Sequence, residues 1–587
     1  MTTPKGASEA FPVRYLNPEW QGAHRELFDK SLTQELEKIL PPGVDQQQFD
    51  EAISEYVGVL GKDGVFVGSA LRDFIDPYEI WESEGNRRLP SAAVCPRSNE
   101  ELHEVIKVSN KYKIPLWTFS RGKNLGYGGP APRLNGSVAL DLHRMNRIIE
   151  VSEKYSYAVV EPGVTFQDLY DHCAKNKLKV WPSCPTLGWG SVLGNTLDRG
   201  SGWTPTNVHH QNICGLEVML ANGELLRTGQ FSMNGNDSAH LSKYSFGPSV
   251  EGLFLQSNLG VVVKLGIWLY PQPPAYMACA LDVPDFEDIE SAVDAMAPLR
   301  QNGLIPHTVF FANIIEVVAF HGPRCDFWDG PGPIPDEKLA EFSKKADWGY
   351  WRGRFGLYGH PDVIGAQFNK IKELLEAACP KGRVLGNLYS GENGGLLDPA
   401  SVPGLDGGNW LGVPSLTILP LVKFMCPKGG GIPAHGDFSP IVPNDGKQVL
   451  EWLRNTRSIF EEQGFDLFCE FYMHERHSIF VHMFIFDKSN PKHRKSVDKI
   501  FNNCYQEARA LGYAKYRSHV NHMDMVADCY DFNNHAYRRF VEKLKDSLDP
   551  NGILSPGKSG IWPERFRMHR QIPNREVKTE RAGKAKL

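Results

Sequence analysis

The sequence predicts an α+β protein with at least two domains. The chain has 587 residues, which is too long for one hydrophobic core. From Ala92 onward, short strand patterns alternate with amphipathic helix patterns, as in α/β or α+β proteins. Asn222-Gly223 separates two apolar runs and predicts a hairpin turn. At least part of the sheet structure is therefore expected to be antiparallel.

The elements of the first half follow in a regular order. Two amphipathic helices are expected within residues 28–60, separated by Pro41-Pro42-Gly43, and residues 1–60 are interpreted as an N-terminal helical packing element. The apolar patterns then predict strands at 92–96, 115–119, 137–142, 147–151, 157–163, 216–229 and 261–270, and helices over 99–112 and from Thr165.

A proline-rich segment marks the predicted domain boundary. Tyr270-Pro271-Gln272-Pro273-Pro274 is expected to exclude regular structure, because proline fixes φ and lacks an N–H donor. The first domain is therefore placed at residues 61–274 and a second at 275–510, which opens with a strand and a helix over 279–303. Residues 511–587 form either a separate tail or a return to the first domain.

Composition limits the classes of partner. There are 64 Lys+Arg against 69 Asp+Glu, a net charge of −5 that gives no attraction for nucleic acid. The eleven cysteines are scattered without a C-x-x-C pair, which indicates neither a zinc site nor a disulfide framework and favours a reducing compartment. No apolar window approaches the length of a membrane span, so we expect a soluble protein that is not secreted. The final Ala585-Lys586-Leu587 is similar to the S-K-L peroxisomal address and predicts a peroxisomal location, otherwise cytoplasmic.

A glycine-rich loop follows the predicted strand 115–119. Glycines permit positive φ and let backbone N–H groups surround an anion, and two cationic side chains accompany them. The loop is neither a Walker motif nor a Rossmann fingerprint. We interpret it as a diphosphate-binding loop rather than a long flexible turn. Its residues of interest are Ser120, Arg121, Gly122, Lys123, Asn124, Gly126 and Gly128.

A second small-residue stretch over 187–196 contains Gly190, Ser191, Gly194 and Asn195, and it lies between VEPGV at 160–164 and QSNLGVV at 256–262. With these motifs, AHGDFSP at 434–440, YRSH at 516–519 and DPNGILSPGKSG at 549–560, the chain resembles the vanillyl-alcohol oxidase and p-cresol methylhydroxylase family of flavoproteins. The resemblance implies a two-domain, PCMH-type FAD-binding fold. The segment 511–587 would return to the FAD domain, and the second domain would be a cap over the isoalloxazine ring.

The resemblance also implies which residues hold FAD. These are the residues of the two glycine-rich stretches named above, together with Gly260, Val261, Arg517 and Lys558. His435 is implied as the residue that binds the flavin 8α-methyl group covalently; the alternative is a structural histidine bonded to a backbone carbonyl. At the position of the family's histidine that assists flavin attachment, this chain has Tyr78.

Three residues carry the prediction about substrate. In family members that act on para-substituted phenols, residues matching Tyr127, Tyr516 and Arg517 hold the substrate as a phenolate. A phenol has a pKa of about 10, so ionisation near neutral pH requires about 4 kcal/mol. One guanidinium and two hydroxyl donors in a cavity of low dielectric constant can supply this. The alternative is two core tyrosines and a structural arginine.

A carboxylate is needed as an acid or base for the step that follows hydride loss. Vanillyl-alcohol oxidases place an Asp where this chain has Thr186. Glu470 lies 35 positions beyond His435, where p-cresol methylhydroxylases have an acid, and apolar residues flank it in a predicted strand. We assign Glu470 this role, with Asp437 as the second candidate; a structural partner for a cap-domain arginine is the alternative.

The predicted function is FAD-dependent oxidation of 4-hydroxybenzyl alcohols or 4-alkylphenols by hydride transfer from the benzylic carbon to flavin N5, through a quinone methide. Oxygen, or another acceptor, would reoxidise the flavin, and oxygen would yield hydrogen peroxide. The resemblance implies a homodimer or larger homo-oligomer. Two alternatives remain: the same fold acting on a carbohydrate or 2-hydroxy acid, and a flavin-loaded protein without phenol turnover. No metal is expected, because His474 and His477 should point to opposite faces of a strand and no other group has ligand spacing.

Overall fold

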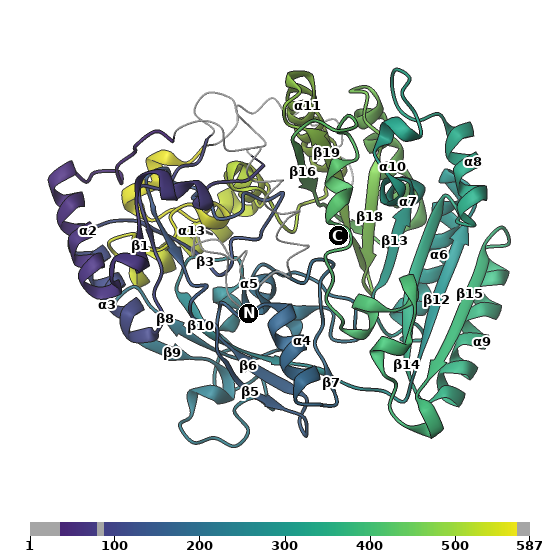
Figure 1. The fold of residues 1–587 in the computed structure, drawn as a ribbon, viewed down its shortest axis with the longest axis horizontal. Coiled ribbons are helices and arrows are strands. Elements are labelled where there is room, and N and C mark those ends of the chain that lie inside the picture. Colours follow the sequence, from purple (N-terminus) through teal and green to yellow (C-terminus); the bar gives the residue numbers. More distant parts are fainter. Residues whose placement is uncertain (1–35, 79–86, 572–587) are drawn as a thin grey trace. The chain divides into compact units, whose positions relative to one another are not determined.

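The computed structural model describes residues 36–78 and 87–571 and has the expected α+β fold, in two compact units (Figure 1). Among the described residues, the first unit comprises those up to Gly202, Val208–Pro271 and those from Ser518 onward. The second unit comprises Trp203–Asn207 and Gln272–Arg517. In the described part of the chain, no helix combines the length and apolar character needed to cross a bilayer.

The first unit contains two main sheets. Strands β1-β2-β4-β3 form a sheet in which β2, β4 and β3 are parallel, and β5-β6-β10-β8-β9 form an antiparallel sheet. The strands are β1 (Val65–Phe66), β2 (Ala93–Val94), β3 (Leu116–Phe119), β4 (Val138–Asp141), β5 (Ile148–Ser152), β6 (Tyr157–Val160), β7 (Val180–Trp181), β8 (Ile213–Met219), β9 (Leu225–Arg227), β10 (Val261–Trp268) and β11 (Tyr270–Pro271). The helices are α2 (Gln46–Leu60), α3 (Asn99–Tyr112), α4 (Phe166–Lys175), α5 (Val192–Leu197), α12 (Met523–Ala527) and α13 (Phe532–Leu548).

Local sequence explains where these helices begin. The Ser98 side chain accepts a hydrogen bond from the N–H of Glu101 at the start of α3, and Thr165 forms a reciprocal capping box with Asp168 at the start of α4. The predicted helix over 99–112 and the predicted helix start at Thr165 are thereby confirmed. Of the two helices expected within 28–60, the second is α2, whereas most of the first lies outside the described residues.

One sequence expectation about the boundary is wrong. The proline-rich segment was expected to exclude regular structure, yet Tyr270–Pro271 pairs antiparallel with Val180–Trp181. A proline is tolerated in such a two-residue edge pairing because its fixed φ fits an extended strand and its missing N–H need not face a partner. The chain passes to the second unit directly afterwards, at Gln272.

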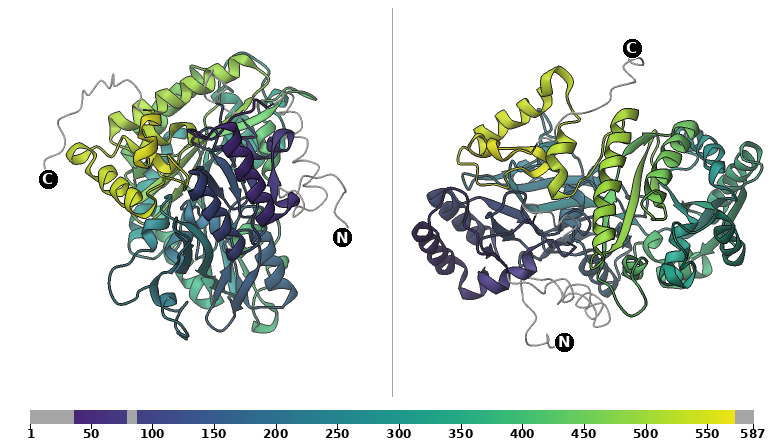
Figure 2. Two further views of the ribbon diagram at one scale, coloured as in Figure 1. Left: turned by 90° about the vertical axis from the view of Figure 1, so that its left-hand side faces the viewer. Right: turned by 90° about the horizontal axis from the view of Figure 1, so that it is seen from above.

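The C-terminal segment is part of the first unit. Leu116 of β3 pairs in parallel with Leu554, and Ile553 and Leu554 belong to the same core as α2, α3 and β4. Both views in Figure 2 show this segment, in yellow, as helices α12 and α13 with connecting loops. The chain rejoins the first unit at Ser518, somewhat later than the start of the predicted return at residue 511.

The second unit is built on an eight-stranded sheet with the order β15-β12-β14-β13-β18-β19-β16, and β17 also pairs with β19. Every pairing is antiparallel. The strands are β12 (Ala275–Val283), β13 (Val309–Asn313), β14 (Trp351–Gly359), β15 (Arg383–Ser390), β16 (Pro433–Phe438), β17 (Ile441–Pro443), β18 (Phe468–Met473) and β19 (His477–Asp487). The helices are α6 (Ile289–Gln301), α7 (Ile314–His321), α8 (Asp336–Ala346), α9 (Pro361–Ala378), α10 (Gly446–Glu461) and α11 (Pro491–Leu511).

The two faces of this sheet differ in chemistry. On one face the rings of Phe311, Phe471 and Phe480 stack in succession, and His482 accepts a hydrogen bond from the Trp452 indole of α10 at 2.7 Å. Alternate residues occupy the other face, which we call the polar face, because successive strand residues point to opposite sides. Helix α10 contacts the apolar face through Trp452, and the polar face carries Arg354, Glu470, His435 and Asp437.

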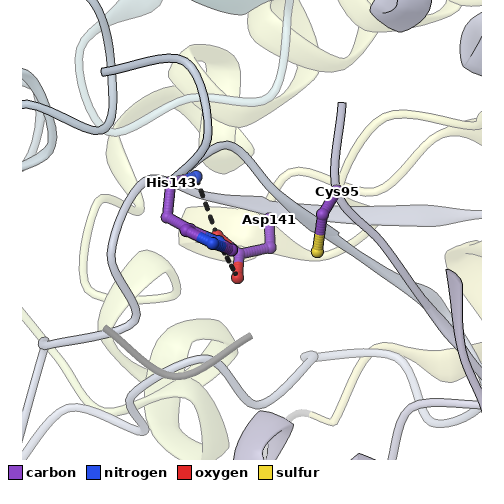
Figure 3. A group of neighbouring side chains, drawn as sticks. All are labelled: Cys95, Asp141 and His143. Atoms are coloured by element: carbon purple, nitrogen blue, oxygen red, sulfur yellow. Dashed lines mark hydrogen bonds and ion pairs between the residues drawn. The ribbon is translucent and has the colours of Figure 1, made fainter. Parts of the chain in front are cut away.

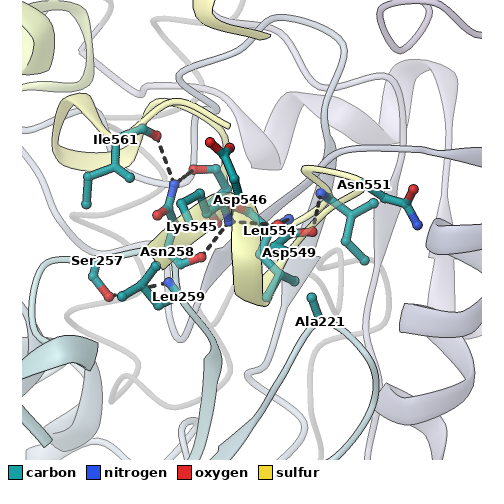
Figure 4. A network of polar contacts seen from close by, with 12 residues as sticks. Ala221, Ser257, Asn258, Leu259, Lys545, Asp546, Asp549, Asn551, Leu554 and Ile561 are labelled. Carbon is teal, nitrogen blue, oxygen red and sulfur yellow. Dashed lines mark hydrogen bonds and ion pairs between the residues drawn. The ribbon is translucent and has the colours of Figure 1, made fainter. Parts of the chain in front are cut away.

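A buried lysine, Lys545, joins the C-terminal segment to the rest of the first unit (Figure 4). The Lys545 ammonium group of α13 is fully buried; it donates to the carbonyl oxygens of Asn258 at 2.6 Å and Leu554 at 2.7 Å, and lies 2.7 Å from the Asp549 carboxylate. Asp549 also accepts the N–H groups of Ile553 and Leu554. The Asn258 side chain donates to two further carbonyls of the C-terminal segment. Every charge in the network therefore has hydrogen-bonding partners.

We predict that Lys545→Met destabilises the first unit by about 3–5 kcal/mol, since removing one partner of a buried ion pair leaves the other charge uncompensated. Lys543→Met, on an exposed position of the same helix, is the matched control and should change little. Denaturant unfolding of both variants measures the difference. Equal unfolding midpoints for Lys545→Met and the control would contradict the importance of this network.

Candidate functional site

The glycine-rich loop of the first unit follows β3 and forms consecutive tight turns. The carbonyl oxygen of Asn124 accepts the N–H groups of Tyr127 at 3.1 Å and Gly129 at 3.0 Å. Gly122, Gly126 and Gly128 have φ values of 62°, 79° and 106°, which side-chain-bearing residues rarely adopt. The glycines are therefore required by the backbone path itself.

The second small-residue stretch meets this loop at one point. A Cβ added to Gly194 would lie 2.2 Å from the Ser120 hydroxyl oxygen, so only glycine fits there. Ser191 caps the short helix α5 by accepting the Gly194 N–H at 2.9 Å, and it donates to the carbonyl of Pro162 at 2.6 Å. The Asn195 side chain lies 2.7 Å from His209 Nδ1. The structure thus brings together two stretches that the sequence assigned to one cofactor.

Two cations lie at this place. Arg121 is buried, and the Lys123 ammonium group lies 4.5 Å from the centre of the Trp189 ring. Burial and the neighbouring Arg121 lower the pKa of Lys123 well below its usual value, and Asp73 opposes this only in part. A bound anion would stabilise both cations, as would be expected of a site for a diphosphate. The donor chemistry and the close approach at Gly194 fit the diphosphate of a dinucleotide.

The other predicted cofactor residues of the first unit have more varied surroundings. A Cβ on Gly260 would lie 2.5 Å from a methyl group of Val218, and the Val261 side chain belongs to the hydrophobic core. These two residues can therefore offer a ligand only their backbone. The Lys558 ammonium group forms an ion pair with Asp198 at 3.0 Å.

Tyr127 lies beside a buried histidine–aspartate pair, His519 and Asp76, that the sequence analysis missed. The Tyr127 side chain is buried, and its carbonyl accepts the N–H of Val520 at 3.2 Å. The preceding His519 lies 2.9 Å from Asp76, whose other carboxylate oxygen accepts the N–H of Tyr78. Tyr78 therefore stands next to a buried imidazole of the first unit, although the tyrosine itself replaces the family's histidine.

In the second unit, His435 and Asp437 lie on the polar face of β16. Both are buried, and His435 Nε2 lies 3.7 Å from an Asp437 carboxylate oxygen. Asp437 is directly opposite Met483, which in turn is opposite Phe468, two residues before Glu470. The register therefore places His435, Asp437 and Glu470 on the same face of the sheet.

Tyr516 and Arg517 follow a segment that pairs with the chain after β16. Tyr516 donates its N–H to the carbonyl of Ser439 at 3.2 Å, and Pro440 and Lys515 form an antiparallel bridge. The Arg517 guanidinium carbon lies 5.5 Å from the centre of the Tyr516 ring. Within the second unit, two of the three residues predicted to bind phenolate, Tyr516 and Arg517, therefore follow a segment that makes backbone contacts with the residues just after β16, the strand that carries His435.

Glu470 belongs to a cluster of charged groups, two of which the sequence analysis did not identify. Burial raises the pKa of Glu470 well above its usual value, the nearby Glu316 and Asp437 add to this, and Arg354 opposes it. Burial also raises the pKa of Glu316 to about 7, against the effect of Arg354. The sequence signal for Glu316 is a single carboxylate within the apolar helical run Ile314–His321.

Two observations bear on metal binding. In the described part of the chain, the one group of three side chains with metal-ligand chemistry is Cys95, Asp141 and His143 (Figure 3). There Asp141 already accepts the His143 N–H at 2.9 Å and lies 2.7 Å from His143 Nδ1, so its two oxygens serve a local turn. The expected separation of His474 and His477 on one strand is wrong: they flank a hairpin turn, with ring centres 5.0 Å apart. The absence of a metal stays a prediction.

Comparison with known proteins decides the family. The FAD binding domain family matches residues 90–229, and the family of C-terminal domains of FAD linked oxidases matches residues 424–559. The chain is 34% identical over 535 residues to the 4-cresol dehydrogenase [hydroxylating] flavoprotein subunit of Pseudomonas putida, covering 90% of this chain and 99% of that one. The chain belongs to the vanillyl-alcohol oxidase and p-cresol methylhydroxylase family.

Two solved structures of this family resemble the chain over nearly its whole length. Crystalline p-cresol methylhydroxylase with substrate bound has a TM-score of 0.81 and 34% identity, with 89% of this chain and 99% of that one covered. The isoeugenol complex of 4-ethylphenol oxidase from Gulosibacter chungangensis has the same TM-score and identity, with 90% and 100% covered. Family membership makes this protein an FAD-dependent oxidoreductase with a PCMH-type fold.

We predict that Gly194→Ala lowers FAD content, because the new methyl group would force Ser120 away from the loop at a cost of about 1–3 kcal/mol. If the cost falls on the FAD-bound state, it corresponds to a loss of affinity of about fivefold to about a hundredfold. Gly252→Ala is the control, since no atom lies within 4 Å of its added Cβ. The ratio of flavin to protein absorbance measures occupancy, and wild-type occupancy in Gly194→Ala would refute the prediction.

Proposed function

We propose that this enzyme oxidises para-substituted phenols, such as 4-hydroxybenzyl alcohols and 4-alkylphenols, at the benzylic carbon. The observation that carries the proposal is the likeness along almost the entire chain to proteins named for 4-cresol and 4-ethylphenol. The chain has Tyr127, Tyr516 and Arg517 at the positions expected for phenolate binding. The pair of tyrosines with Arg517 argues against a carbohydrate or a 2-hydroxy acid as the substrate.

Ionisation of the phenol is the contribution of these three residues. The Arg517 guanidinium cannot be deprotonated near neutral pH, and it supplies the fixed positive charge. Hydroxyl donors from Tyr127 and Tyr516 would share the remaining negative charge by charge-assisted hydrogen bonds. Together they would lower the pKa of the bound phenol by about three units, which corresponds to about 4 kcal/mol.

Oxidised FAD, when bound, supplies the acceptor for the benzylic hydride. The phenolate then becomes a quinone methide, to which water adds or which loses a proton. Glu470 is the acid or base for that step, because it is a buried carboxyl group whose pKa is raised by burial and by the nearby Glu316 and Asp437. Asp437 is the second candidate, on the same face of the sheet. Oxygen would reoxidise the flavin and yield peroxide.

The experiment that tests this function uses the purified holoenzyme without oxygen. Mixing it with a panel of 4-alkylphenols and 4-hydroxybenzyl alcohols should bleach the oxidised flavin absorbance, while D-lactate and simple sugars should not. Admission of air should restore the absorbance and form peroxide. Bleaching by a 2-hydroxy acid alone, or by no compound of the panel, would reject phenol oxidation.

We predict that Arg517→Ala lowers kcat/KM for 4-ethylphenol by at least about tenfold near neutral pH, since the phenolate loses its fixed counter-charge. The loss should shrink as the pH approaches about 10, where the phenol ionises unaided. Arg476→Ala replaces an exposed arginine of the same unit and serves as the control. A loss that is independent of pH would mean that Arg517 has a role other than stabilising the phenolate.

Covalent attachment of FAD to His435 is proposed on similar grounds. His435 is buried on the polar face, and an Asp437 carboxylate oxygen lies 3.7 Å from its Nε2. We predict that acid-precipitated protein stays yellow and that mass spectrometry finds flavin on a peptide containing His435. His435→Ala should release all flavin on precipitation. Complete release from the wild-type protein would exclude the bond without excluding FAD binding.

Two expectations stay predictions. The final Ala585-Lys586-Leu587 lies outside the described residues, so the structure does not test the peroxisomal address. The expected homodimer or larger homo-oligomer is likewise untested.

A further inference from the structure

The polar face of the second unit contains an arginine surrounded by aromatic rings. The Arg354 guanidinium carbon lies 5.7 Å from the centre of the Trp203 ring, 5.4 Å from Phe310, 6.0 Å from Trp348 and 5.8 Å from Trp410. These distances permit cation–π attraction, which stabilises the charged form without neutralising it. Arg354 Nε is buried and has no hydrogen-bond partner among the described residues.

Two carboxylates, Glu470 and Glu316, lie in the same region as Arg354. Arg354 lies opposite Phe310 on β14 and β13, and Glu470 lies opposite Ala312 on β18 and β13, which places Arg354 and Glu470 on one face. Glu316 lies three residues after the end of β13, in helix α7, and α7 packs against β18. One Glu316 carboxylate oxygen is buried without a hydrogen-bond partner among the described residues. A buried carboxylate in this condition favours the protonated form.

The charges do not balance if every group is ionised. Glu316, Glu470 and Asp437 would carry three negative charges against the single positive charge of Arg354. Two carboxylates near one cation can release one proton easily, whereas loss of the second would leave two like charges in a poorly solvated place. Other titratable groups on these strands include His435 on β16 and Tyr472 on β18, and Arg352, Tyr276 and Asp406 also act electrostatically on Arg354.

We propose that Glu316 is a positioning residue for proton transfer at Glu470, and that the two carboxyl groups with Arg354 form one unit that holds a single proton near neutral pH. This inference rests on the proposed phenol oxidation. When water adds to the quinone methide, a new C–O bond forms, the electron pair of the exocyclic double bond returns to the ring and the phenolate, and the proton of water passes to the unprotonated carboxylate. The unit then holds two protons and releases one to solvent before the next turnover.

The test is an infrared titration of the holoenzyme, which follows the C=O stretch of protonated carboxyl groups from about pH 5 to about pH 9. The C=O band that changes in Glu470→Gln is assigned to the unit formed by Glu316, Glu470 and Arg354. Glu316→Gln removes the like charge, so the remaining carboxyl should titrate at least about one pH unit lower, a tenfold weaker hold on its proton. Arg354→Gln removes the cation and should shift the band to higher pH.

Glu316→Asp keeps a carboxylate and should restore most of the wild-type titration, which a purely structural role would not require. Glu341→Gln, an exposed carboxylate of α8, is the control and should leave the band unchanged. If Glu316→Gln does not fold, the opposite shift in Arg354→Gln still decides the matter. An unchanged titration in Glu316→Gln or a downward shift in Arg354→Gln would overturn the proposal.

The pH profile of kcat links the unit to turnover. In the plot of kcat against pH, the apparent pKa assigned to Glu470 should shift in Glu316→Gln in the same direction as the infrared titration. KM should change little. The infrared result does not depend on the substrate, so it can fail while phenols are still oxidised. Conversely, absence of phenol turnover with the expected infrared shifts would reject the proposed function but leave the proton-sharing unit intact.

Discussion

The antiparallel register of the eight-stranded sheet decides which side chains meet in the second unit. With a side-chain period of two, Arg354, Phe310, Tyr472 and Glu470 fall on one face, and Phe311, Phe471 and Phe480 fall on the other. A slip by one residue would bury the charged groups beneath the helices. The stacked phenylalanines therefore fix the register through their burial, and the polar face follows from it.

Sequence alone could predict the parts of the site that depend on local backbone chemistry. Gly122, Gly126 and Gly128 have positive φ values, and the clash that a Cβ on Gly194 would cause shows why that residue is small. Such requirements leave a recognisable pattern in a single sequence. The helix starts at Ser98 and Thr165 are also local, because each cap bonds to a residue only three positions away.

The partners of Glu470 could not be predicted in this way. Arg354 shares a face with Glu470 through the order of strands β14, β13 and β18, and Glu316 lies on α7, which follows β13; both residues are more than a hundred positions from Glu470 in the chain. The link between His519 and Asp76 spans an even greater length. The pairing of Tyr270–Pro271 and the hairpin between His474 and His477 were missed because strand ends depend on their partners.

The two units treat buried charge in opposite ways, and this difference separates a structural cluster from a reactive one. Lys545 and Asp549 are fully buried, and carbonyl and N–H groups, together with their contact with each other, supply hydrogen-bonding partners to both. Arg354 and Glu316 each retain a buried atom without a hydrogen-bond partner among the described residues, and the carboxylates outnumber the cation. Electrostatic strain of this kind costs stability. The proposed proton-sharing unit would use this strain, because a proton held among unbalanced charges changes its position readily when a charge changes beside it.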